Sequence, residues 1–373
     1  MKPPVNLKSI LFVTYHFPPE IGGIHTRISH YVRELRRRGI AVTVFVITTR
    51  GEDVKRYSVD GADVYVCPGQ LKFFGRNATY LLKSVFSKQA DVIHVFTGAS
   101  TFIGIFSLFV GRLKRVPSVI SFFGKEQFET VTLIQRALLP FSLRLATSIG
   151  LNTPYTRGLV PEVFRGKTHV LLGGAEVSEP VGNPKFNGKA STILFVGRLI
   201  ERKGEDDLIR ALPLVRERCP QSRLVLVGDG PDRKRFEDLA RSLDLSGQVE
   251  FRGTLTGRAL NDAYEESSVV VLPSKHVKGD SSSETMGFTL IEASMHAKPL
   301  VGTLHGGIPE IIKDGKNGLL VPENSPRELA AALVRILSDE ELAKRLGKNA
   351  LEMAEDKFTW KAATDRLLES YAR

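Results

Sequence analysis

Two short stretches, Ser9-Ile10-Leu11-Phe12-Val13 and Thr192-Ile193-Leu194-Phe195-Val196, have nearly the same sequence at an offset of 183 positions. Each is an apolar run of strand length, followed by a glycine-bearing loop and by a segment with apolar residues at helical spacing. Strands that alternate with amphipathic helices are typical of a parallel sheet with crossover helices. The repeat therefore predicts an α/β protein built from two similar doubly wound domains.

The domain boundaries follow from the point at which this pattern restarts. We predict a Rossmann-like N-terminal domain over residues 1–172, a linker rich in Gly, Pro, Glu and Asn over 173–190, and a second Rossmann-like domain over 191–355. Apolar residues at helical spacing predict a C-terminal helix over 356–373. A length of 373 residues suits two domains that each bury a core.

The composition excludes several classes of protein. The chain is 42% apolar and 25% charged, with a mean hydropathy of −0.06, which excludes a disordered tail, a collagen-like repeat and an integral membrane bundle. Its two cysteines, Cys67 and Cys219, have no second cysteine near either of them, so neither a disulfide framework nor a zinc ribbon is expected. A cytoplasmic setting fits best.

The net charge of +11 is concentrated in the first half of the chain. Residues 1–175 contain 23 Lys+Arg and 10 Asp+Glu, whereas the remainder has a net charge of −2. Such a basic half favours nucleic acid, an anionic lipid surface or a phosphorylated substrate as partner, with a merely soluble basic surface as the alternative. The apolar run 102–109 is followed by Arg112, Lys114 and Arg115, a combination that suits a membrane-facing patch. The alternative, an ordinary buried crossover helix, is the interpretation we favour.

The first candidate site is the segment from Glu284 to Glu292, which follows a polar loop and opens an apolar helix. A helix N-terminus offers unpaired N–H groups and partial positive charge, which suit a phosphate or a sugar hydroxyl. The eight-residue spacing predicts that both carboxylates lie on one helix face, roughly 12 Å apart along the axis. Such a pair suits two hydroxyl-bearing rings of one extended ligand. A capping role for Glu284 with a surface ion pair for Glu292 is the alternative.

The second candidate site combines Arg198, which follows a strand, with Lys203 near a helix start. Two cations at the carboxyl end of a central strand suit a diphosphate, although acidic neighbours also allow a surface ion pair. In the first domain, Gly22 and Gly23 would let backbone N–H groups approach an anion, or would simply form a turn. The sequence has no Asp-x-Asp, His-Glu-x-x-His or Cys-x-x-Cys motif, so neither a metal nor another cofactor is expected.

Taken together and in this order, these segments resemble the retaining glycosyltransferases of family 4, which have the GT-B fold of two facing Rossmann-like domains. The resemblance is strongest over 191–325 and weaker over the N-terminal half. Its motifs are Gly197-Arg198 with Lys203-Gly204, Val227-Gly228-Asp229-Gly230, Phe251-Arg252-Gly253, the Glu-x7-Glu pair, and Gly306-Gly307-Ile308-Pro309-Glu310. For such a fold we expect the C-terminal helix to cross back to the first domain.

The resemblance also implies roles for individual residues. Arg198 and Lys203 would hold the diphosphate of a nucleotide sugar, and Glu292 the ribose hydroxyls. Glu284 would hold the transferred sugar, and Leu255 would offer backbone contacts to the base. The remaining donor-binding residues would be Met286, Gly287, Phe288 and Thr289 beside the sugar, with Gly22 and Gly23 approaching the diphosphate.

The activity that the resemblance implies is the retaining, metal-independent transfer of a hexose. The donor would be a nucleotide-diphosphate sugar, most often that of uridine, and the acceptor a glycan, a lipid-linked or a phosphorylated molecule. Arg198, Lys203 and Glu284 would be the catalytic groups, the two cations stabilising the departing diphosphate. The protein could also act at the inner face of the membrane, and no nucleic acid is expected. A non-catalytic nucleotide-sugar-binding protein and a sugar-nucleotide 2-epimerase are the alternatives.

The chain departs from the family pattern at Phe123 and Met286, and Gly173-Gly174-Ala175-Glu176 replaces the common Asn-Gly-Val-Asp before the linker. Phe123 stands where many relatives carry a histidine that is proposed to take part in catalysis or to contact the sugar. Met286 stands where phenylalanine is usual. The first departure implies either that the histidine is dispensable here or that the activity has changed.

Overall fold

The computed structural model describes residues 7–15, 17, 23–48, 55–68, 90–96, 102–123, 133–175, 191–280 and 282–372. The chain divides into two compact units. The N-terminal unit consists of Met1–Gly174 together with Trp360–Arg373, and the C-terminal unit of Ala175–Thr359. Most of the predicted linker, residues 176–190, lies outside the described residues.

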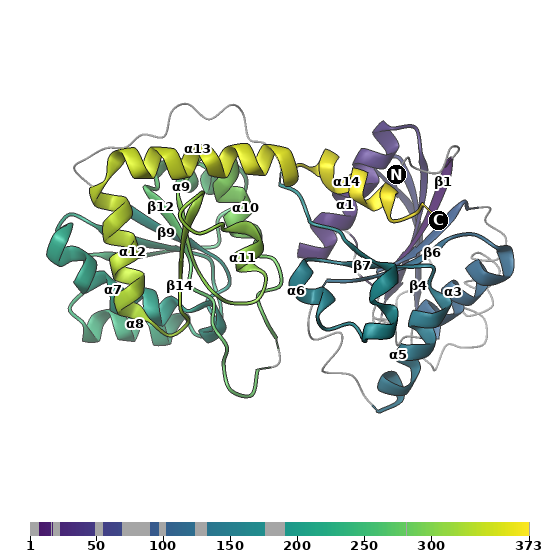
Figure 1. The fold of residues 1–373 in the computed structure, drawn as a ribbon, viewed down its shortest axis with the longest axis horizontal. Coiled ribbons are helices and arrows are strands. Elements are labelled where there is room, and N and C mark those ends of the chain that lie inside the picture. The colour runs from purple at the N-terminus through teal and green to yellow at the C-terminus, as the bar shows by residue number, and fades with distance from the viewer. Residues whose placement is uncertain are drawn as a thin grey trace. The chain divides into compact units, whose positions relative to one another are not determined.

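The N-terminal unit is built on an eight-stranded sheet with the order β3-β4-β2-β1-β5-β6-β7-β8 (Figure 1). All neighbouring strands are parallel except β3 and β4. The strands are β1 (Ser9–Thr14), β2 (Ala41–Thr48), β3 (Lys55–Val59), β4 (Ala62–Pro68), β5 (Val92–Val95), β6 (Ser118–Phe122), β7 (Ser148–Leu151) and β8 (Thr168–Val170). The first of the two repeated stretches thus forms a central strand, as its apolar character predicts.

The antiparallel pair β3–β4 is an addition to the doubly wound pattern. A two-residue turn joins the strands, and both of its residues, Asp60 and Gly61, have positive φ angles of 48° and 76°. This conformation suits the right-handed twist of a hairpin, and Asp-Gly is one of its preferred sequences. The dipeptide is therefore the sequence signal that marks this hairpin.

The helices of the N-terminal unit cover its sheet. In α1 (Gly23–Arg37), Ile28, Tyr31, Val32 and Leu35 are all buried, which is the spacing of one helix face. The other helices of eight or more residues among the described residues are α3 (Phe102–Lys114) and α5 (Leu133–Leu145), with α14 (Trp360–Glu369) from the end of the chain. Shorter elements are α6 (Pro154–Arg157) and the 3-10 helix η2 (Glu162–Lys167).

Helix α14 packs against α1, as expected for a C-terminal helix that returns to the first domain. The Trp360 ring stacks on His30 at 4.3 Å, and Asp365 accepts a hydrogen bond of 2.5 Å from Arg38. The predicted single helix over 356–373 is wrong in its bounds, because α13 (Glu340–Lys357) ends and α14 begins at Trp360. The break at 358–359 is where the chain passes from one unit to the other.

The C-terminal unit has a fully parallel six-stranded sheet with the order β11-β10-β9-β12-β13-β14. Its strands are β9 (Thr192–Val196), β10 (Arg223–Val227), β11 (Val249–Gly253), β12 (Val269–Leu272), β13 (Leu300–Thr303) and β14 (Gly318–Val321). Helices α7 (Glu205–Arg218), α8 (Arg233–Ser242) and α12 (Pro326–Ser338) cover one face, and α10 (Phe288–Met295) with α13 the other (Figure 1). The unit also contains α9 (Gly257–Glu266) and two shorter elements, α11 (Ile308–Ile311) and the 3-10 helix η3 (Glu201–Lys203).

The strand order locates the ligand-binding edge of the C-terminal sheet. Counted along the chain from β9, the order is 3-2-1-4-5-6, which is the order of the Rossmann fold. The direction of winding reverses between β9 and β12, and in open α/β sheets ligands bind at the carboxyl ends of the strands at such a point. Within the described residues, no helix is long and apolar enough to cross a bilayer.

Candidate functional site

The loop after β9 carries the two predicted cations to the point at which the winding reverses. Arg198 is exposed and lies two residues after the end of β9, and Lys203 is the last residue of η3. Gly204 then turns the chain into α7 with a φ of +79°, and a Cβ on it would lie 2.0 Å from the carbonyl oxygen of Pro273. Only glycine allows this approach, which holds Lys203 beside the loop that follows β12.

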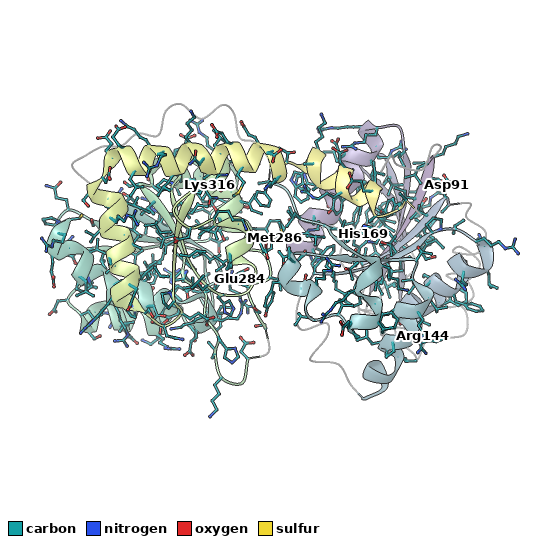
Figure 2. The ribbon with its side chains drawn as sticks, in the orientation of Figure 1. Asp91, Arg144, His169, Glu284, Met286 and Lys316 are labelled. Atoms are coloured by element: carbon teal, nitrogen blue, oxygen red, sulfur yellow. The ribbon has the colours of Figure 1, made fainter. Side chains whose placement is uncertain are left out.

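Glu284, which is labelled in Figure 2, lies in the loop before α10. Its carboxylate accepts a hydrogen bond from the ammonium group of Lys203. The Nζ–Oε2 distance is 2.5 Å, and the two side chains are only 14% and 12% exposed. The carboxylate also accepts hydrogen bonds from the backbone N–H of Gly287 at 3.1 Å and from the hydroxyl of Ser274 at 3.4 Å. Burial raises the pKa of Glu284, but Lys203 and Arg202 outweigh this effect, so its pKa is lowered and the group is a carboxylate at neutral pH.

The prediction that Glu284 and Glu292 share one helix face is wrong. Helix α10 begins only at Phe288, because Gly287 adopts a left-handed conformation with a φ of +68°. Glu284 therefore lies outside the helix, whereas Glu292 lies in its second turn. The two carboxylates are held separately, one by Lys203 and the other by a tyrosine.

Glu292 accepts a hydrogen bond of 2.7 Å from the hydroxyl of Tyr264, which lies in α9. Burial raises the pKa of Glu292, and this hydrogen bond partly offsets the effect. The pKa of Tyr264 is also raised, by burial and by the neighbouring carboxylate, so the phenol keeps its proton and acts as the donor. This pair fixes the orientation of the Glu292 carboxyl group.

The remaining predicted residues are distributed over both units. Leu255 lies half-buried in the loop between β11 and α9, and Met286 is buried directly before Gly287. Phe288 and Thr289 are half-buried in the first turn of α10. Gly22 lies outside the described residues, and Gly23 is the first residue of α1 in the N-terminal unit.

Three further residues at this edge were not singled out from the sequence. Arg202 lies with its Nη1 3.8 Å from Oε2 of Glu284. The ring of His305 contacts Glu323 through Nδ1 at 2.9 Å, and its Nε2 lies 3.4 Å from the backbone nitrogen of Glu284. If Nδ1 carries the proton, Nε2 can accept from that backbone N–H, so the His305–Glu323 pair supports the loop that carries Glu284. The positions of Arg202, next to Lys203, and of His305, directly before Gly306-Gly307, were the available signals.

Phe123, which the family resemblance places where many relatives carry a histidine, is part of the core of the N-terminal unit. It follows β6, is buried, and lies 5.8 Å from Phe96 between ring centroids. The guanidinium of Arg27 lies over its ring at 4.4 Å. The side chain therefore packs against a cation and another aromatic ring, and it has no group that transfers a proton.

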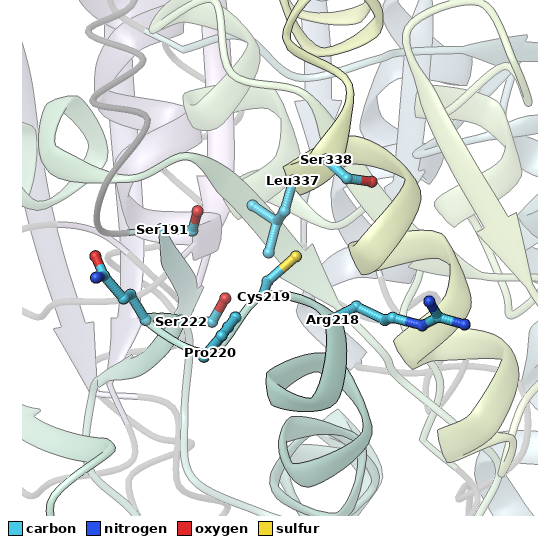
Figure 3. A pocket seen from close by; sticks show the side chains of 8 residues that line it. Ser191, Arg218, Cys219, Pro220, Ser222, Leu337 and Ser338 are labelled. Carbon is cyan, nitrogen blue, oxygen red and sulfur yellow. The ribbon is translucent and has the colours of Figure 1, made fainter.

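The C-terminal unit also contains a cavity away from the charged residues. A cavity of about 360 Å³ lies at the amino-terminal edge of the sheet, where Ser191 precedes β9 and Ser222 precedes β10, with Cys219 on its wall (Figure 3). This edge is opposite to the one that carries Lys203 and Glu284.

Within the described residues, no group of three or more His, Cys, Asp or Glu is arranged to hold a metal ion.

The fold and this arrangement define a protein of the Rossmann-like class with a charged site at the reversal point of the second sheet. Residues 181–353 match the model of the glycosyl transferases group 1 family, and residues 22–171 match that of the glycosyl transferase 4-like domain. The chain therefore belongs to the family 4-type glycosyltransferases, and its activity is that of a glycosyltransferase using nucleotide sugars.

Relatives of known activity align over almost the whole chain. A GDP-mannose-dependent alpha-(1-6)-phosphatidylinositol monomannoside mannosyltransferase of Mycolicibacterium smegmatis is 26% identical over 96% of this chain and 97% of its own length. A sulfoquinovosyl transferase of Arabidopsis thaliana is 27% identical over 93% of this chain and 70% of its own length. Both are named as transferases of sugars.

Solved structures show the same fold. HepE of Anabaena in complex with UDP superposes with a TM-score of 0.77 at 18% identity, covering 97% of this chain and 99% of that protein. The lipopolysaccharide outer core galactosyltransferase WaaB superposes with a TM-score of 0.72 at 16% identity, covering 97% of this chain and 98% of that protein. The fold of this chain is therefore the GT-B fold that the sequence motifs predicted.

Proposed function

We propose that this chain is a retaining, metal-independent glycosyltransferase that moves a hexose from a nucleotide-diphosphate sugar to a glycan, lipid-linked or phosphorylated acceptor. The observation that carries the proposal is the contact between Lys203 and Glu284, which lie 81 positions apart in the sequence and meet at the reversal point of the sheet. Arg198 lies in the same loop as Lys203, between β9 and η3. A cation for the diphosphate and a carboxylate for sugar hydroxyls thus lie next to each other. In a nucleotide sugar, the diphosphate and the sugar are likewise directly bonded neighbours, so one such ligand could contact both side chains.

The proposed chemistry follows from the leaving group. Cleavage of the anomeric bond leaves negative charge on the diphosphate and an oxocarbenium-like sugar, so cations placed in advance lower the barrier. Arg198 can bind phosphate oxygens as a fork and Lys203 as a point charge. Because these side chains supply the positive charge, we propose that no metal ion is required.

For the donor nucleotide we propose uridine first and guanosine as the competing choice. HepE, a structural neighbour, was solved in complex with UDP, whereas the mycobacterial relative is named as GDP-mannose-dependent. Glu292, oriented by Tyr264, would accept hydrogen bonds from the ribose hydroxyls, which both nucleotides share. The two nucleotides differ only in the base, beside which Leu255 is proposed to lie.

Calorimetric titration with UDP, GDP and their sugars, each with and without EDTA, tests this proposal. We expect one nucleotide to bind equally well with EDTA. Lys203→Met should weaken binding by about 10- to 100-fold, since a hydrogen bond to a charged group contributes about 1.5–3 kcal/mol. Arg241→Gln is the matched control, because Arg241 is an exposed cation on α8 that pairs with Asp238. Absence of binding by all nucleotides would contradict the proposal.

Transfer assays then separate the alternatives. NMR of the product should show that the anomeric configuration of the donor is retained. Donor binding without transfer to any acceptor would favour a non-catalytic nucleotide-sugar-binding protein. Conversion of the donor sugar to its 2-epimer without an acceptor would favour the epimerase.

We also propose that the N-terminal unit docks on an anionic membrane surface through α3 and α5. The two helices pack against each other and expose Phe109 (44%), Leu113 (57%) and Phe141 (48%). Arg112 and Arg144 are exposed on the same two helices, and neither helix contains an Asp or a Glu. Apolar side chains among cations, without carboxylates, suit the boundary between lipid headgroups and acyl chains.

Co-sedimentation with vesicles tests the docking surface. We expect binding to vesicles that contain phosphatidylglycerol and little binding to pure phosphatidylcholine. Each of Arg112→Gln and Arg144→Gln should weaken binding about fivefold, since a cation near the surface contributes about 1 kcal/mol. Leu304→Ser, which removes an exposed apolar side chain of the C-terminal unit, is the control. Equal binding by all variants would contradict this surface.

A further inference from the structure

Under the proposed function, the ammonium group of Lys203 has two anionic partners, the Glu284 carboxylate and the donor diphosphate. It cannot bind both at their shortest distances. This ammonium group already binds Glu284 at 2.5 Å, and both side chains are largely buried. A donor diphosphate would draw the ammonium group toward its own oxygens. A buried carboxylate that loses its cation tends to take up a proton, and a protonated Glu284 would accept fewer hydrogen bonds from the sugar.

The guanidinium of Arg202 lies close enough to Glu284 to act as a second cation for its carboxylate. Its side chain is 14% exposed, and its Nε and Nη1 have no hydrogen-bond partner among the described residues. The nearest carboxylates are Glu284, 3.8 Å from Nη1, and Asp280, 3.8 Å from Nε. Buried N–H groups are nearly always hydrogen-bonded, so these two donors require an explanation.

The backbone of Arg202 is held in place by the loop that follows β12. Its carbonyl oxygen accepts a hydrogen bond of 2.9 Å from the backbone N–H of Lys275. The ammonium group of Lys275 binds Asp206 at 2.8 Å and Asp207 at 3.0 Å, which ties this loop to α7. A movement of the guanidinium by about 1 Å would bring it to the N–O distance of a charge-assisted hydrogen bond with Glu284.

We propose that Arg202 is a positioning residue. When the donor diphosphate draws the ammonium group of Lys203 away from Glu284, the guanidinium of Arg202 forms the ion pair with the Glu284 carboxylate instead. The proposal rests on the proposed function for the role of Lys203. Among the residues that the structure describes, the other groups bonded to the Glu284 carboxylate are the hydroxyl of Ser274 and the backbone N–H of Gly287, which are neutral. Arg202 is therefore the cation that keeps Glu284 ionised and in place while the sugar is transferred.

The first test needs no ligand, because Lys203→Met removes the ammonium group as the donor would. The pKa of the Glu284 carboxyl is followed by ¹³C NMR of glutamate-labelled protein, with Glu284→Gln assigning its signal. We expect Glu284 to remain ionised at neutral pH in Lys203→Met, and its pKa to rise by at least about one unit when Arg202→Gln is added. An equal pKa in the single and double variants would overturn the proposal.

The second test uses the donor. We expect Arg202→Gln to leave the Kd of the bare nucleoside diphosphate within about twofold of wild type while kcat with the nucleotide sugar falls roughly 10²-fold, as for a misplaced group. Arg202→Lys keeps the charge without the fork and should restore part of kcat. Arg241→Gln should leave both values unchanged. A wild-type kcat in Arg202→Gln would overturn this inference alone.

The two tests separate this inference from the proposed function. A wild-type protein that binds no nucleotide overturns the proposed function, and the NMR measurement still tests the response of Arg202. Thermal unfolding of each variant shows whether it is folded. If Arg202→Gln does not fold, Arg202→Met takes its place in the NMR test, where loss of the guanidinium charge should still raise the pKa of Glu284 in the Lys203→Met background. An unchanged pKa would overturn the proposal.

Discussion

Replacement of Gly204 by alanine tests how the loop that carries Lys203 is held. Gly204 has a φ of +79°, and an added Cβ would lie 2.0 Å from the Pro273 carbonyl oxygen and 2.9 Å from its carbon. The left-handed conformation costs a non-glycine residue roughly 1–2 kcal/mol. The overlap with the backbone adds about 1–3 kcal/mol, as for other overpacked sites. We therefore expect Gly204→Ala to lower the free energy of unfolding of the C-terminal unit by about 3 kcal/mol.

Gly315→Ala is the matched control for this prediction. Gly315 belongs to the same unit and has a φ of +70°, but an added Cβ would meet no atom within 4 Å. The control should therefore lose only about 1–2 kcal/mol. Both variants are compared by urea unfolding, followed by calorimetric titration with the preferred nucleotide, whose affinity should fall in Gly204→Ala alone. Equal losses of stability in the two variants would show that the close approach to Pro273 does not hold the loop.

Three further predictions concern titratable groups. Tyr264→Phe removes the hydrogen bond to Glu292 and should weaken nucleotide binding about tenfold at neutral pH, since a hydrogen bond to a charged group contributes about 1.5–3 kcal/mol; unchanged affinity by calorimetry would contradict a role for the pair. Burial raises the pKa of Glu205 from 4.5 to about 8, so the folded state keeps a proton that the unfolded state releases, and stability falls as the pH rises between these values. In urea unfolding, the free energy of unfolding of Glu205→Gln should rise relative to that of wild type by at most about 1.4 kcal/mol per pH unit between these values. A stability difference that does not change with pH would count against a buried protonated Glu205. Burial lowers the pKa of His94 from 6.5 to about 3, so wild type should lose stability as the pH falls below 6.5; His94→Gln should lose less, and parallel pH profiles would argue against a neutral buried imidazole.

The fold was largely predictable because its signals are local. The apolar runs at Ile10–Val13 and Ile193–Val196 are long enough for strands and are followed by glycines and helical periods, so two doubly wound units follow from the sequence. The hairpin of β3 and β4 was not predicted, although Asp60-Gly61 marks its turn. The single C-terminal helix was wrong because helical periodicity continues across residues 358–359, where the chain changes unit.

The candidate site was predictable in its residue types and not in its geometry. The eight-residue spacing of Glu284 and Glu292 fits a helix, and periodicity alone cannot show that Gly287 turns left-handed and starts the helix four residues late. The partner of each carboxylate lies far away in the chain, Lys203 at 81 positions from Glu284 and Tyr264 at 28 from Glu292. Such pairings depend on the order of strands in the sheet, which no local pattern contains.

The amino-acid sequence alone specifies the α/β class, the two units and the residues that resemble a nucleotide-sugar site, because strand length, helical period and glycine positions act over a few neighbouring residues. The folded chain adds the contacts between loops that follow β9 and β12, which place Lys203 and Arg202 around Glu284. The physical reason is that parallel strands bring their carboxyl ends to one edge of the sheet, whatever their separation in sequence. Ionisation, hydrogen bonding and burial of the site residues are properties of that edge.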